Sequence, residues 1–440
     1  MRRLAAVATL GVLLAAPSAR ANGRLPEANQ LVAAPDDPSS LILRTTFGML
    51  FSHDAGKTWD WLCETAYVCE STQCTPPQED PAIAILNGGL VLAAEYEGLA
   101  LSPDDGCSWS FAPGTAKVNT IDVARSPDGA TAVAVTSALA SLDGGILNDS
   151  RVLRTTDAGK TWAPLSGVVD PTLSIDTLDL APSDPQRIYL TGHVLGQTHA
   201  TLLVSTDGGQ SYQSRTITFA AGEGAAFIAA VDPTNPDRLY VRTLGTADGS
   251  AEQFSRLLVS SDAGQTFTEA WAGDKLLGFA LSKDGSRVYI GSALAGLQAA
   301  SASDLAFTQK SAMQVSCLAT AGDVLYACAA NEGNAQTVTG SAFIVGSTLD
   351  EGATFTPLVR LETIHAPIDC ASSTTAAICA TQWPALELQL GIDAGAPDAG
   401  APPSSGCGCE STHGARDGAL FAALLALVVT LRNRLFRAAR

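Results

Sequence analysis

The sequence is poor in charge and in the residues from which catalytic and metal sites are usually built. Only 16% of its 440 residues are charged, and it has 5 His and 3 Met. Strongly charged disorder is therefore excluded over most of the length. The chain has no Gly-x4-Gly-Lys-Ser/Thr, Gly-x-Ser-x-Gly, His-x3-His or Cys-x2-Cys motif. These absences argue against P-loop nucleotide hydrolases, nucleophile-elbow hydrolases and zinc sites of the common spacings.

Basic residues are scarce as well, with 26 Lys and Arg against 44 Asp and Glu. Without the two chain ends, residues 22–406 hold 18 basic and 42 acidic residues, a net charge of about −24. Such a surface repels phosphate backbones, so no nucleic-acid partner is expected. What the chain has instead is 46% hydrophobic residues, 40 Gly and 22 Pro. This composition predicts a large apolar core interrupted by many turns.

The N-terminus has the three parts of a secretory signal peptide. Arg2 and Arg3 are followed by an apolar stretch at residues 4–16 and then by Ala19 and Ala21, small residues at the positions that a signal peptidase reads. We expect residues 1–21 to be cleaved and the chain to be exported; a buried N-terminal helix is the alternative.

The C-terminus carries a second set of signals. Residues 391–406 are rich in Ala, Gly, Pro and Asp, which is typical of a linker. Cys407 and Cys409 follow, then an apolar run at residues 419–431 and four terminal arginines. The run has 13 residues, short of the ~20 that cross a bilayer comfortably. A plain transmembrane anchor would need the flanking arginines to snorkel.

This order of elements over residues 406–440 resembles the MYXO-CTERM sorting tail of myxobacterial surface proteins. The resemblance implies cleavage near the cysteines by a processing protease and retention at the outer membrane or cell surface. It also implies that Cys407 or Cys409 bears a lipid anchor. Residues 407–440 are therefore expected to be a sorting tail.

The remaining eight cysteines suit an oxidising compartment. Cys317 and Cys328 flank one short turn, and Cys370 and Cys379 flank another, so each pair is expected to form a cross-strand disulfide. The other four have three possible pairings that the spacing leaves open; they are Cys63, Cys69, Cys74 and Cys107. A zinc site is the alternative for these four, although no histidine is placed to help.

One octet, Ser/Thr-x-Asp-x-Gly-x-Ser/Thr-aromatic, recurs six times in full and once in a shortened form. In such an octet the Asp accepts backbone hydrogen bonds, the Gly takes a conformation closed to other residues, and the aromatic ring packs between sheets. The Asp, Gly and aromatic positions are Asp54, Gly56, Trp59; Asp104, Gly106, Trp109; Asp157, Gly159, Trp162; Asp207, Gly209, Tyr212; Asp262, Gly264, Phe267; Asp304, Phe307 (shortened); and Asp350, Gly352, Phe355.

The octets recur every 42 to 55 residues, which is the period of propeller blades. Between octets the chain shows three short strand patterns, as at residues 175–180, 187–190 and 201–204, with the octet joining the third strand to the fourth. The sequence therefore predicts an all-β fold, a β-propeller of four-stranded antiparallel blades spanning residues 22–390. Seven octet-bearing units run from residue 27 to about 361. Residues 364–390 are expected to form either an eighth blade or a covering hairpin.

The octet resembles the Asp box, or BNR repeat, of sialidases, sortilin-like receptors, xyloglucan-degrading glycoside hydrolases and photosystem II assembly factors. The resemblance covers residues 27–361 and implies architecture; it says little about activity, because the box is a turn. A sialidase would need a Phe/Tyr-Arg-Ile/Leu-Pro motif near its start, and this chain has none.

Few residues remain as candidates for chemistry. Arg187, Arg238 and Arg287 repeat at one blade position and are expected to pair along the sheet edge. Acidic turns such as Asp104-Asp105 offer oxygens to Ca²⁺, but no Ca²⁺-loop motif is present, so no metal and no cofactor are expected. The acidic residues expected to face a central channel are Glu95, Glu97, Asp122, Asp176, Asp179 and Asp232.

We expect a monomeric, surface-anchored binding or adhesion module without catalytic residues, whose partner is an extracellular protein, peptide or glycan. A glycoside hydrolase that acts on extracellular glycans through two channel carboxylates is the alternative.

Overall fold

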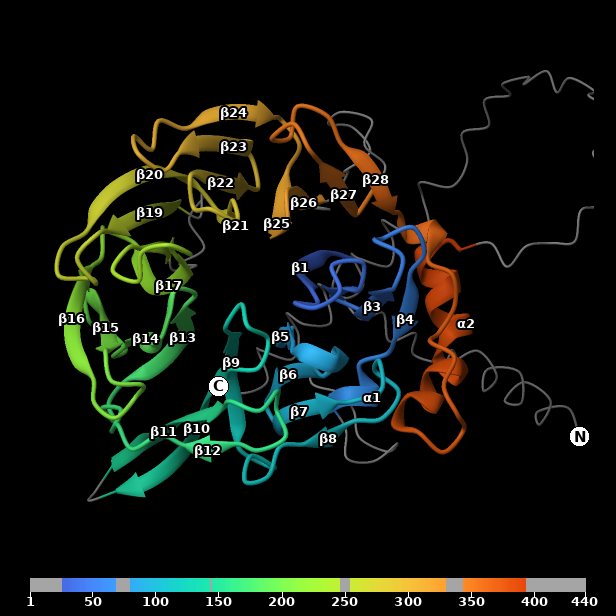
Figure 1. The fold of residues 1–440 in the computed structure, drawn as a ribbon, viewed down its shortest axis with the longest axis horizontal. Helices are drawn as coiled ribbons and strands as arrows, with labels where there is room; N and C mark the ends of the chain where they lie inside the picture. Colours follow the sequence, from blue (N-terminus) through green and yellow to red (C-terminus); the bar gives the residue numbers. More distant parts are fainter. Residues whose placement is uncertain (1–25, 69–79, 143–144, 246–253, 330–342, 393–440) are drawn as a thin grey trace, which may run out of the picture. The chain divides into compact units, whose positions relative to one another are not determined.

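In the computed structural model, the described residues are 26–68, 80–142, 145–245, 254–329 and 343–392. They form seven antiparallel four-stranded sheets in which the strands follow each other in chain order. The sheets are arranged as blades around a ring (Figure 1). The fold is a seven-bladed β-propeller.

The bounds of the strands, blade by blade, are as follows. Blades 1 to 3 comprise β1 (Ala28–Ala33), β2 (Leu41–Thr45), β3 (Gly48–Ser52), β4 (Asp60–Leu62); β5 (Ala82–Ile85), β6 (Val91–Glu95), β7 (Gly98–Ser102), β8 (Ser110–Phe111); β9 (Asn119–Arg125), β10 (Ala132–Leu142), β11 (Gly145–Thr155) and β12 (Ala163–Pro164). Blades 4 and 5 comprise β13 (Ser174–Ala181), β14 (Asp184–His193), β15 (His199–Ser205), β16 (Gln213–Thr218); β17 (Glu223–Val231), β18 (Leu239–Gly245), β19 (Phe254–Ser260) and β20 (Thr268–Asp274). Blades 6 and 7 comprise β21 (Leu276–Leu281), β22 (Arg287–Ser292), β23 (Gly296–Ser301), β24 (Thr308–Ser311); β25 (Val315–Ala321), β26 (Val324–Ala329), β27 (Val345–Thr348) and β28 (Thr356–Val359).

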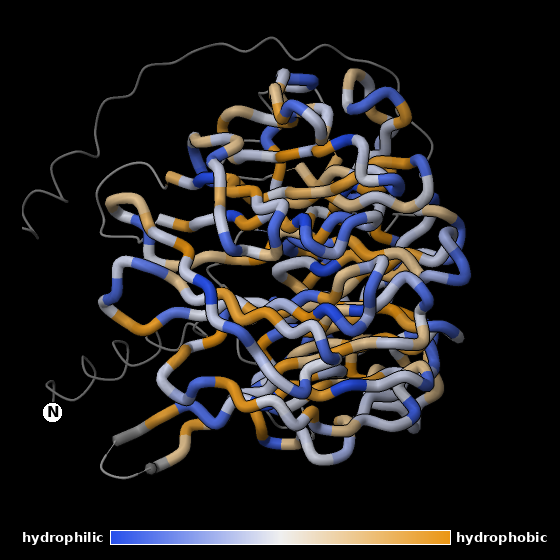
Figure 2. The backbone as a smooth tube through the Cα atoms, turned by 60° about the vertical axis from the view of Figure 1, so that its left-hand side comes forward, coloured by the Kyte–Doolittle hydropathy of each residue, from blue (hydrophilic) through white to orange (hydrophobic). Residues whose placement is uncertain are grey.

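The first strand of each blade lies innermost, and neighbouring innermost strands contact each other around the ring. β1 contacts both β5 and β25, so the ring is closed between blade 7 and blade 1. Aliphatic side chains from adjacent blades form the apolar layers between sheets, such as the cluster around Leu178, Ile188 and Leu203. These layers appear as the orange strand segments inside the molecule (Figure 2).

The antiparallel meander gives the propeller two distinct faces. The connectors between first and second strands lie on the same face as the octet turns, because Ala55 N–H donates to Ser39 O and Ala263 N–H donates to Asp237 O, each at 2.9 Å. We call this the box face. The turns between second and third strands lie on the opposite face, which we call the turn face.

Each full octet is a self-contained hydrogen-bonded turn. In the box of blade 5, Asp262 Oδ1 accepts from Thr266 N–H at 2.9 Å, and Ser260 Oγ accepts from Gly264 N–H at 2.8 Å. Ala263 and Gly264 have φ of 56° and 81°, so two successive residues are left-handed. In the other full boxes the fourth and fifth residues also have positive φ. The fourth residue is a glycine in only one of the full boxes.

The box also fits each blade to the one before it. A Cβ on Gly264 would lie 2.2 Å from Leu202 Cδ2 in blade 4, and similar clashes with the preceding blade occur at the other box glycines. Trp59 is only 1% exposed, and the other box aromatic rings are partly buried against the inter-blade clusters. The shortened box keeps the turn at Asp304, whose Oδ1 accepts from Ala306 N–H at 3.0 Å.

The expectation of an eighth blade or covering hairpin after residue 364 is wrong. Ile368 N–H donates to Trp61 O and Trp61 N–H to Ala366 O, so this segment lies parallel to β4 on the outer edge of blade 1. It then forms α2 (Cys379–Leu390), which includes the stretch expected to be a strand. The other helical segments are α1 (Thr65–Val68) and the 3-10 turns η1 (Asn87–Gly89), η2 (Leu361–Thr363) and η3 (Thr375–Ile378). We call residues 364–392 the strap.

The strap becomes a helix because its apolar residues pack against the rim of the ring. Trp383, Leu386 and Leu390 join the core cluster of blade 1, and the rings of Trp383 and Trp61 lie 5.7 Å apart. The residues at 383, 386 and 390 are three and four apart, which is helical spacing, although residues 385–390 also alternate as a strand does. No helix among the described residues is long and apolar enough to cross a membrane.

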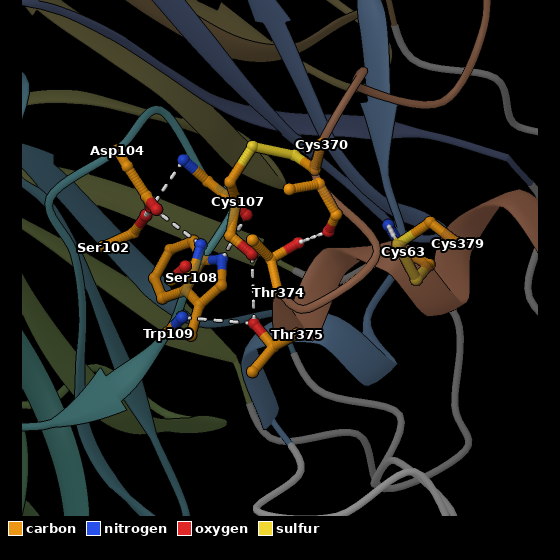
Figure 3. Close-up of a disulfide and its surroundings, with 12 residues drawn as sticks. Cys63, Ser102, Asp104, Cys107, Ser108, Trp109, Cys370, Thr374, Thr375 and Cys379 are labelled. Atoms are coloured by element: carbon orange, nitrogen blue, oxygen red, sulfur yellow. Dashed lines mark hydrogen bonds between the residues drawn. A yellow bond between two sulfur atoms is a disulfide. The ribbon is translucent and has the colours of Figure 1, made fainter.

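Two disulfides fasten the strap. They correct the expected pairing of Cys370 with Cys379 and the expectation that Cys63 and Cys107 pair within their own group of four. Cys379 is bonded to Cys63 and Cys370 to Cys107, while Cys317 and Cys328 pair as expected. Figure 3 shows the Cys107–Cys370 bond beside the box of blade 2, where Thr375 Oγ1 accepts from Trp109 N–H at 3.1 Å. Helix formation moves Cys379 away from Cys370, which removes the hairpin that the expected pair required. Cys69, Cys74, Cys407 and Cys409 lie outside the described residues.

Replacing Gly264 by Ala should destabilise the propeller by about 2–4 kcal/mol, because the added Cβ meets Leu202 and a left-handed side-chain-bearing residue is strained. Ala263→Gly is the matched control, since it relieves the same strain one residue earlier and should stabilise by up to about 1 kcal/mol. Chemical denaturation of both variants measures this. Equal effects at the two positions would contradict the inter-blade role of the box glycine.

Removing the Cys63–Cys379 bond by a double replacement with Ser should lower the free energy of unfolding by about 2–5 kcal/mol, because it frees a loop closed over 316 residues. The Cys317–Cys328 bond closes only 11 residues, so its removal should cost less. Thermal unfolding compares the two. Mass mapping of the oxidised protein should yield a linked Cys107–Cys370 peptide, and a Cys370–Cys379 peptide would refute the strap as described.

Candidate binding channel

The channel along the axis of the ring opens into a cavity of about 740 Å³ at the box face. The last residues of five innermost strands and the connectors that follow them form its wall. Its lining residues are Leu31, Val32, Ala33, Ala34, Pro35, Pro38, Ile83, Ala84, Val123, Ala124, Arg125, Pro127, Leu178, Asp179, Leu180, Pro182, Lys283, Ala319, Thr320, Ala321 and Gly322. The volume falls within the range of small-ligand and peptide sites.

The lining is aliphatic, with a few polar groups and no aromatic ring. Two cations, Arg125 and Lys283, stand at this mouth with one carboxyl, Asp179. Arg125 donates to Ala33 O at 3.2 Å and to Ser126 O at 3.3 Å, which fixes its guanidinium across blades 1 and 3. Burial lowers the pKa of Arg125 from its usual value, while Asp128 and Asp36 oppose that shift. The cavity lining therefore holds two cations and one carboxyl, with Asp36 and Asp128 near Arg125.

Asp122 and Asp179 project from the innermost strands β9 and β13, as expected for channel residues. Asp122 Oδ1 accepts from Val123 N–H at 2.8 Å and Oδ2 from Leu178 N–H at 2.9 Å, so its two oxygens join blade 3 to blade 4. Asp179 accepts from Leu180 N–H at 2.8 Å and interacts with the backbone of Val231 in blade 5. Burial raises the pKa of Asp122 to about 6 and that of Asp179 to about 7.

Other innermost strands are joined by uncharged side chains. Gln30 donates to Ile83 O and accepts from Ile83 N–H, at 3.2 and 3.0 Å, between blades 1 and 2. Thr320 Oγ donates to Leu281 O at 2.8 Å between blades 7 and 6. The two aspartates therefore occupy a structural role that Gln and Thr fill elsewhere.

Two channel arginines were missed by the sequence reasoning. Arg44 Nη1 donates to Asp80 O and Pro81 O at 3.0 and 2.6 Å, where the chain enters β5. Arg242 Nη1 donates to Leu276 O and Leu277 O, both at 3.1 Å, at the start of β21. Burial lowers the pKa of Arg44 to about 10 and lowers that of Arg242 as well. The signal was present: residues 41–45 and 239–243 share the pattern Leu-x-Leu/Val-Arg-Thr.

The other acidic residues expected in the channel are dispersed. Glu95 is buried at the end of β6 and Glu97 is exposed in the turn after it. Asp176 contacts His193 Nδ1 at 2.9 Å, and burial raises the pKa of Asp176. Asp232 follows β17 and closes a turn by accepting from Thr234 N–H and Asn235 N–H. Among the described residues, no three His, Cys, Asp or Glu side chains gather as metal ligands.

The three repeated arginines each bind a group of the following blade. Arg187 pairs with Asp237 of blade 5, and Arg287 binds Glu351 of blade 7. Arg238 donates to Ala302 O of blade 6. They follow a repeated Arg-x-Tyr pattern, in which the Tyr is buried between blades. These arginines therefore stabilise the contacts between blades and are not grouped as a substrate site.

Residues 97–344, which are 248 of the 440, match the model of the Sortilin-Vps10 family, described as sortilin, neurotensin receptor 3. The chain belongs to the Sortilin-Vps10 family. The matched residues run from blade 2 to blade 7 of the propeller. No curated protein matches the Sortilin-Vps10 chain over its sequence.

Several solved structures resemble the Sortilin-Vps10 chain in fold. A GH74 enzyme of Niastella koreensis is 14% identical with a TM-score of 0.36, and the match covers 76% of this chain and 64% of the enzyme. YCF48 bound to D1 peptide is 12% identical with a TM-score of 0.44, covering 69% and 88%. An oligogalacturonate lyase in complex with manganese is 12% identical with a TM-score of 0.45, covering 78% and 88%. The chain thus spans less than two thirds of the length of the GH74 enzyme.

The raised pKa of Asp179 predicts a distinct dependence of stability on pH. In the unfolded chain an Asp has a pKa of about 3.9, so the unfolded state loses its proton first. Stability from this group is greatest below pH 4 and falls as the pH rises to about 7. Asp179→Asn lacks this loss of stability. The melting temperature of the variant minus that of the wild type should therefore increase as the pH rises from 4 to 7.

Asp262→Asn is the control, because its effect on stability should change with pH in the opposite direction. Hydrogen bonds from Thr266 hold the pKa of the box Asp262 at about 2, so its ionised form stabilises the fold above pH 4 and this is lost as the pH falls toward 2. This variant should be less stable than the wild type at pH 7 and converge with it near pH 2. Melting curves from pH 2 to 8 test both; parallel curves for Asp179→Asn and the wild type would contradict the burial of that carboxyl.

Proposed function

We propose that this Sortilin-Vps10 propeller is a non-catalytic binding module that takes an extended peptide segment with aliphatic side chains into the channel from the box face. The supporting observation is the 740 Å³ cavity with its aliphatic wall. A sugar ring usually stacks on an aromatic side chain, and the lining contains none. Val32, Ala124 and the surrounding alanines and prolines instead offer small aliphatic contacts for peptide side chains.

Charge supports the same choice of ligand. Arg125 and Lys283 flank the mouth, while Asp179 is neutral below about pH 7. An acidic residue of the peptide would therefore be attracted to the mouth although the whole domain is acidic. The family match supports a receptor, because its model is described by a receptor's name.

The expected location of this receptor remains the cell surface, with the signal peptide removed and the sorting tail attached to the membrane or to a lipid. The three disulfides among the described residues are compatible with an extracellular compartment.

A glycoside hydrolase is the second candidate function, favoured by the raised pKa values of Asp122 and Asp179. Both oxygens of Asp122 already accept hydrogen bonds from strand N–H groups. To act on a sugar, this carboxylate would have to break its hydrogen bond to Leu178 in β13. That arrangement suits a structural carboxyl better than a general acid or base.

Residues 22–392 contain the whole described core and are suited to binding assays. On peptide arrays we expect binding to segments that combine aliphatic residues with at least one Asp or Glu. Ala124→Phe, which places a ring in the cavity, should weaken binding at least tenfold, whereas Ala380→Phe on the exposed side of α2 should not.

The same protein should show no turnover of chromogenic glycosides or polysaccharides. Turnover that disappears in Asp122→Asn or Asp179→Asn, in variants that remain folded by circular dichroism, would contradict a non-catalytic role and establish the hydrolase.

A further inference from the structure

Large apolar side chains stand exposed on the turn face, one from each of five consecutive blades. They are Tyr96 (blade 2), Leu139 (blade 3), Leu195 (blade 4), Phe254 (blade 5) and Leu294 (blade 6), and each is between 41% and 92% exposed. Tyr96, Leu195 and Leu294 lie between the second and third strands of their blades. Leu139 lies near the end of β10, a second strand, and Phe254 is the first residue of β19, a third strand. We call this set the apolar crown.

Hydrogen bonds and close contacts hold the turns of blades 2, 4 and 6, which carry Tyr96, Leu195 and Leu294. Asp274 Oδ2 accepts from Leu294 N–H at 2.6 Å and Oδ1 accepts from Ser292 Oγ, which fixes the turn of blade 6. Lys117 N–H donates to Glu97 O at 2.7 Å and fixes the turn that carries Tyr96. At blade 4, His193 contacts Asp176 at the base of the turn that carries Leu195. Rigid turns that hold apolar side chains in water are typical of binding surfaces.

The arrangement of the crown selects the kind of partner. Its members are spaced around five of the seven blades with the channel between them, so they do not form one compact patch (Figure 1). Only a broad, nearly flat surface contacts all of these tips at once. A lipid bilayer is such a surface, and its interfacial region accepts Leu, Phe and Tyr side chains.

The apolar run in the C-terminal segment of the sequence is a reason to expect a membrane near the propeller. The apolar run at residues 419–431 begins about 26 residues after Ile392, which limits its distance from the domain to about 90 Å even in a fully extended chain. The net charge of about −24 for residues 22–406 would repel anionic headgroups, so neutral or zwitterionic lipids are the suitable partners.

We propose that the apolar crown docks the propeller, turn face down, on a neutral lipid surface. In this orientation the box face and its cavity point away from the membrane toward soluble ligands. The proposal does not depend on the cavity's ligand, because the crown and the cavity lie on opposite faces.

Residues 22–392, which lack the C-terminal tail, are tested by flotation with phosphatidylcholine vesicles. The wild type should float with the vesicles, and Leu139→Ser/Leu195→Ser/Leu294→Ser should reduce the bound fraction at least tenfold. Leu349→Ser/Leu388→Ser is the control, because Leu349 and Leu388 are 80% and 86% exposed but lie in a box turn and on the strap helix. Circular dichroism and melting temperature verify that both variants are folded.

Vesicles with anionic phosphatidylglycerol give the second arm, and binding to them should be weaker than to phosphatidylcholine. Absence of flotation by the wild type, equal flotation of the two multiple variants, or binding confined to anionic vesicles would each overturn the proposal and assign the crown to a protein partner.

Discussion

The closed ring depends on hydrogen bonds between the innermost strands of neighbouring blades. Each blade is complete as a four-stranded sheet, but its innermost strand faces the channel with one edge that has no further strand to pair with. Unpaired backbone groups in such a place are costly unless a side chain satisfies them. Asp122, Asp179, Gln30 and Thr320 do this, each reaching the innermost strand of a neighbouring blade. Arg44 and Arg242 bind carbonyl groups where the next innermost strand begins.

This requirement explains why acidic side chains in the channel are poor evidence for catalysis. A buried carboxyl with a raised pKa is a reasonable candidate for a general acid wherever its oxygens are free to meet a substrate. At Asp122 both oxygens are used by strand N–H groups, and the same inter-blade position is filled by Gln30 in blade 1. The raised pKa values of Asp122 and Asp179 follow from burial in the wall of the ring.

The sequence was sufficient to predict the architecture, because the Asp box is a local structure. Asp262, Gly264 and their neighbours form a turn whose hydrogen bonds lie within eight residues, so spacing alone located the third and fourth strands. The strap was not predictable in the same way. Its Cys63–Cys379 and Cys107–Cys370 bonds join residues 316 and 263 positions apart. The sequence spacing favoured a bond between the neighbouring cysteines Cys370 and Cys379 instead. Arg44 and Arg242 were missed because their role is to bind carbonyl groups, which any sequence supplies.

The position of the strap determines which part of the fold bears a pulling force applied at the C-terminus. The chain leaves blade 7 at β28 and crosses to blades 1 and 2 before α2 ends at Leu390. A pull applied beyond Ile392 meets the covalent link from Cys379 to Cys63 before it reaches β28, the outermost strand of blade 7. Edge strands separate readily under a pull because their hydrogen bonds open one after another, whereas a disulfide must break chemically. The strap therefore keeps blade 7, which closes the ring against β1, out of the path of a force directed through the C-terminal segment.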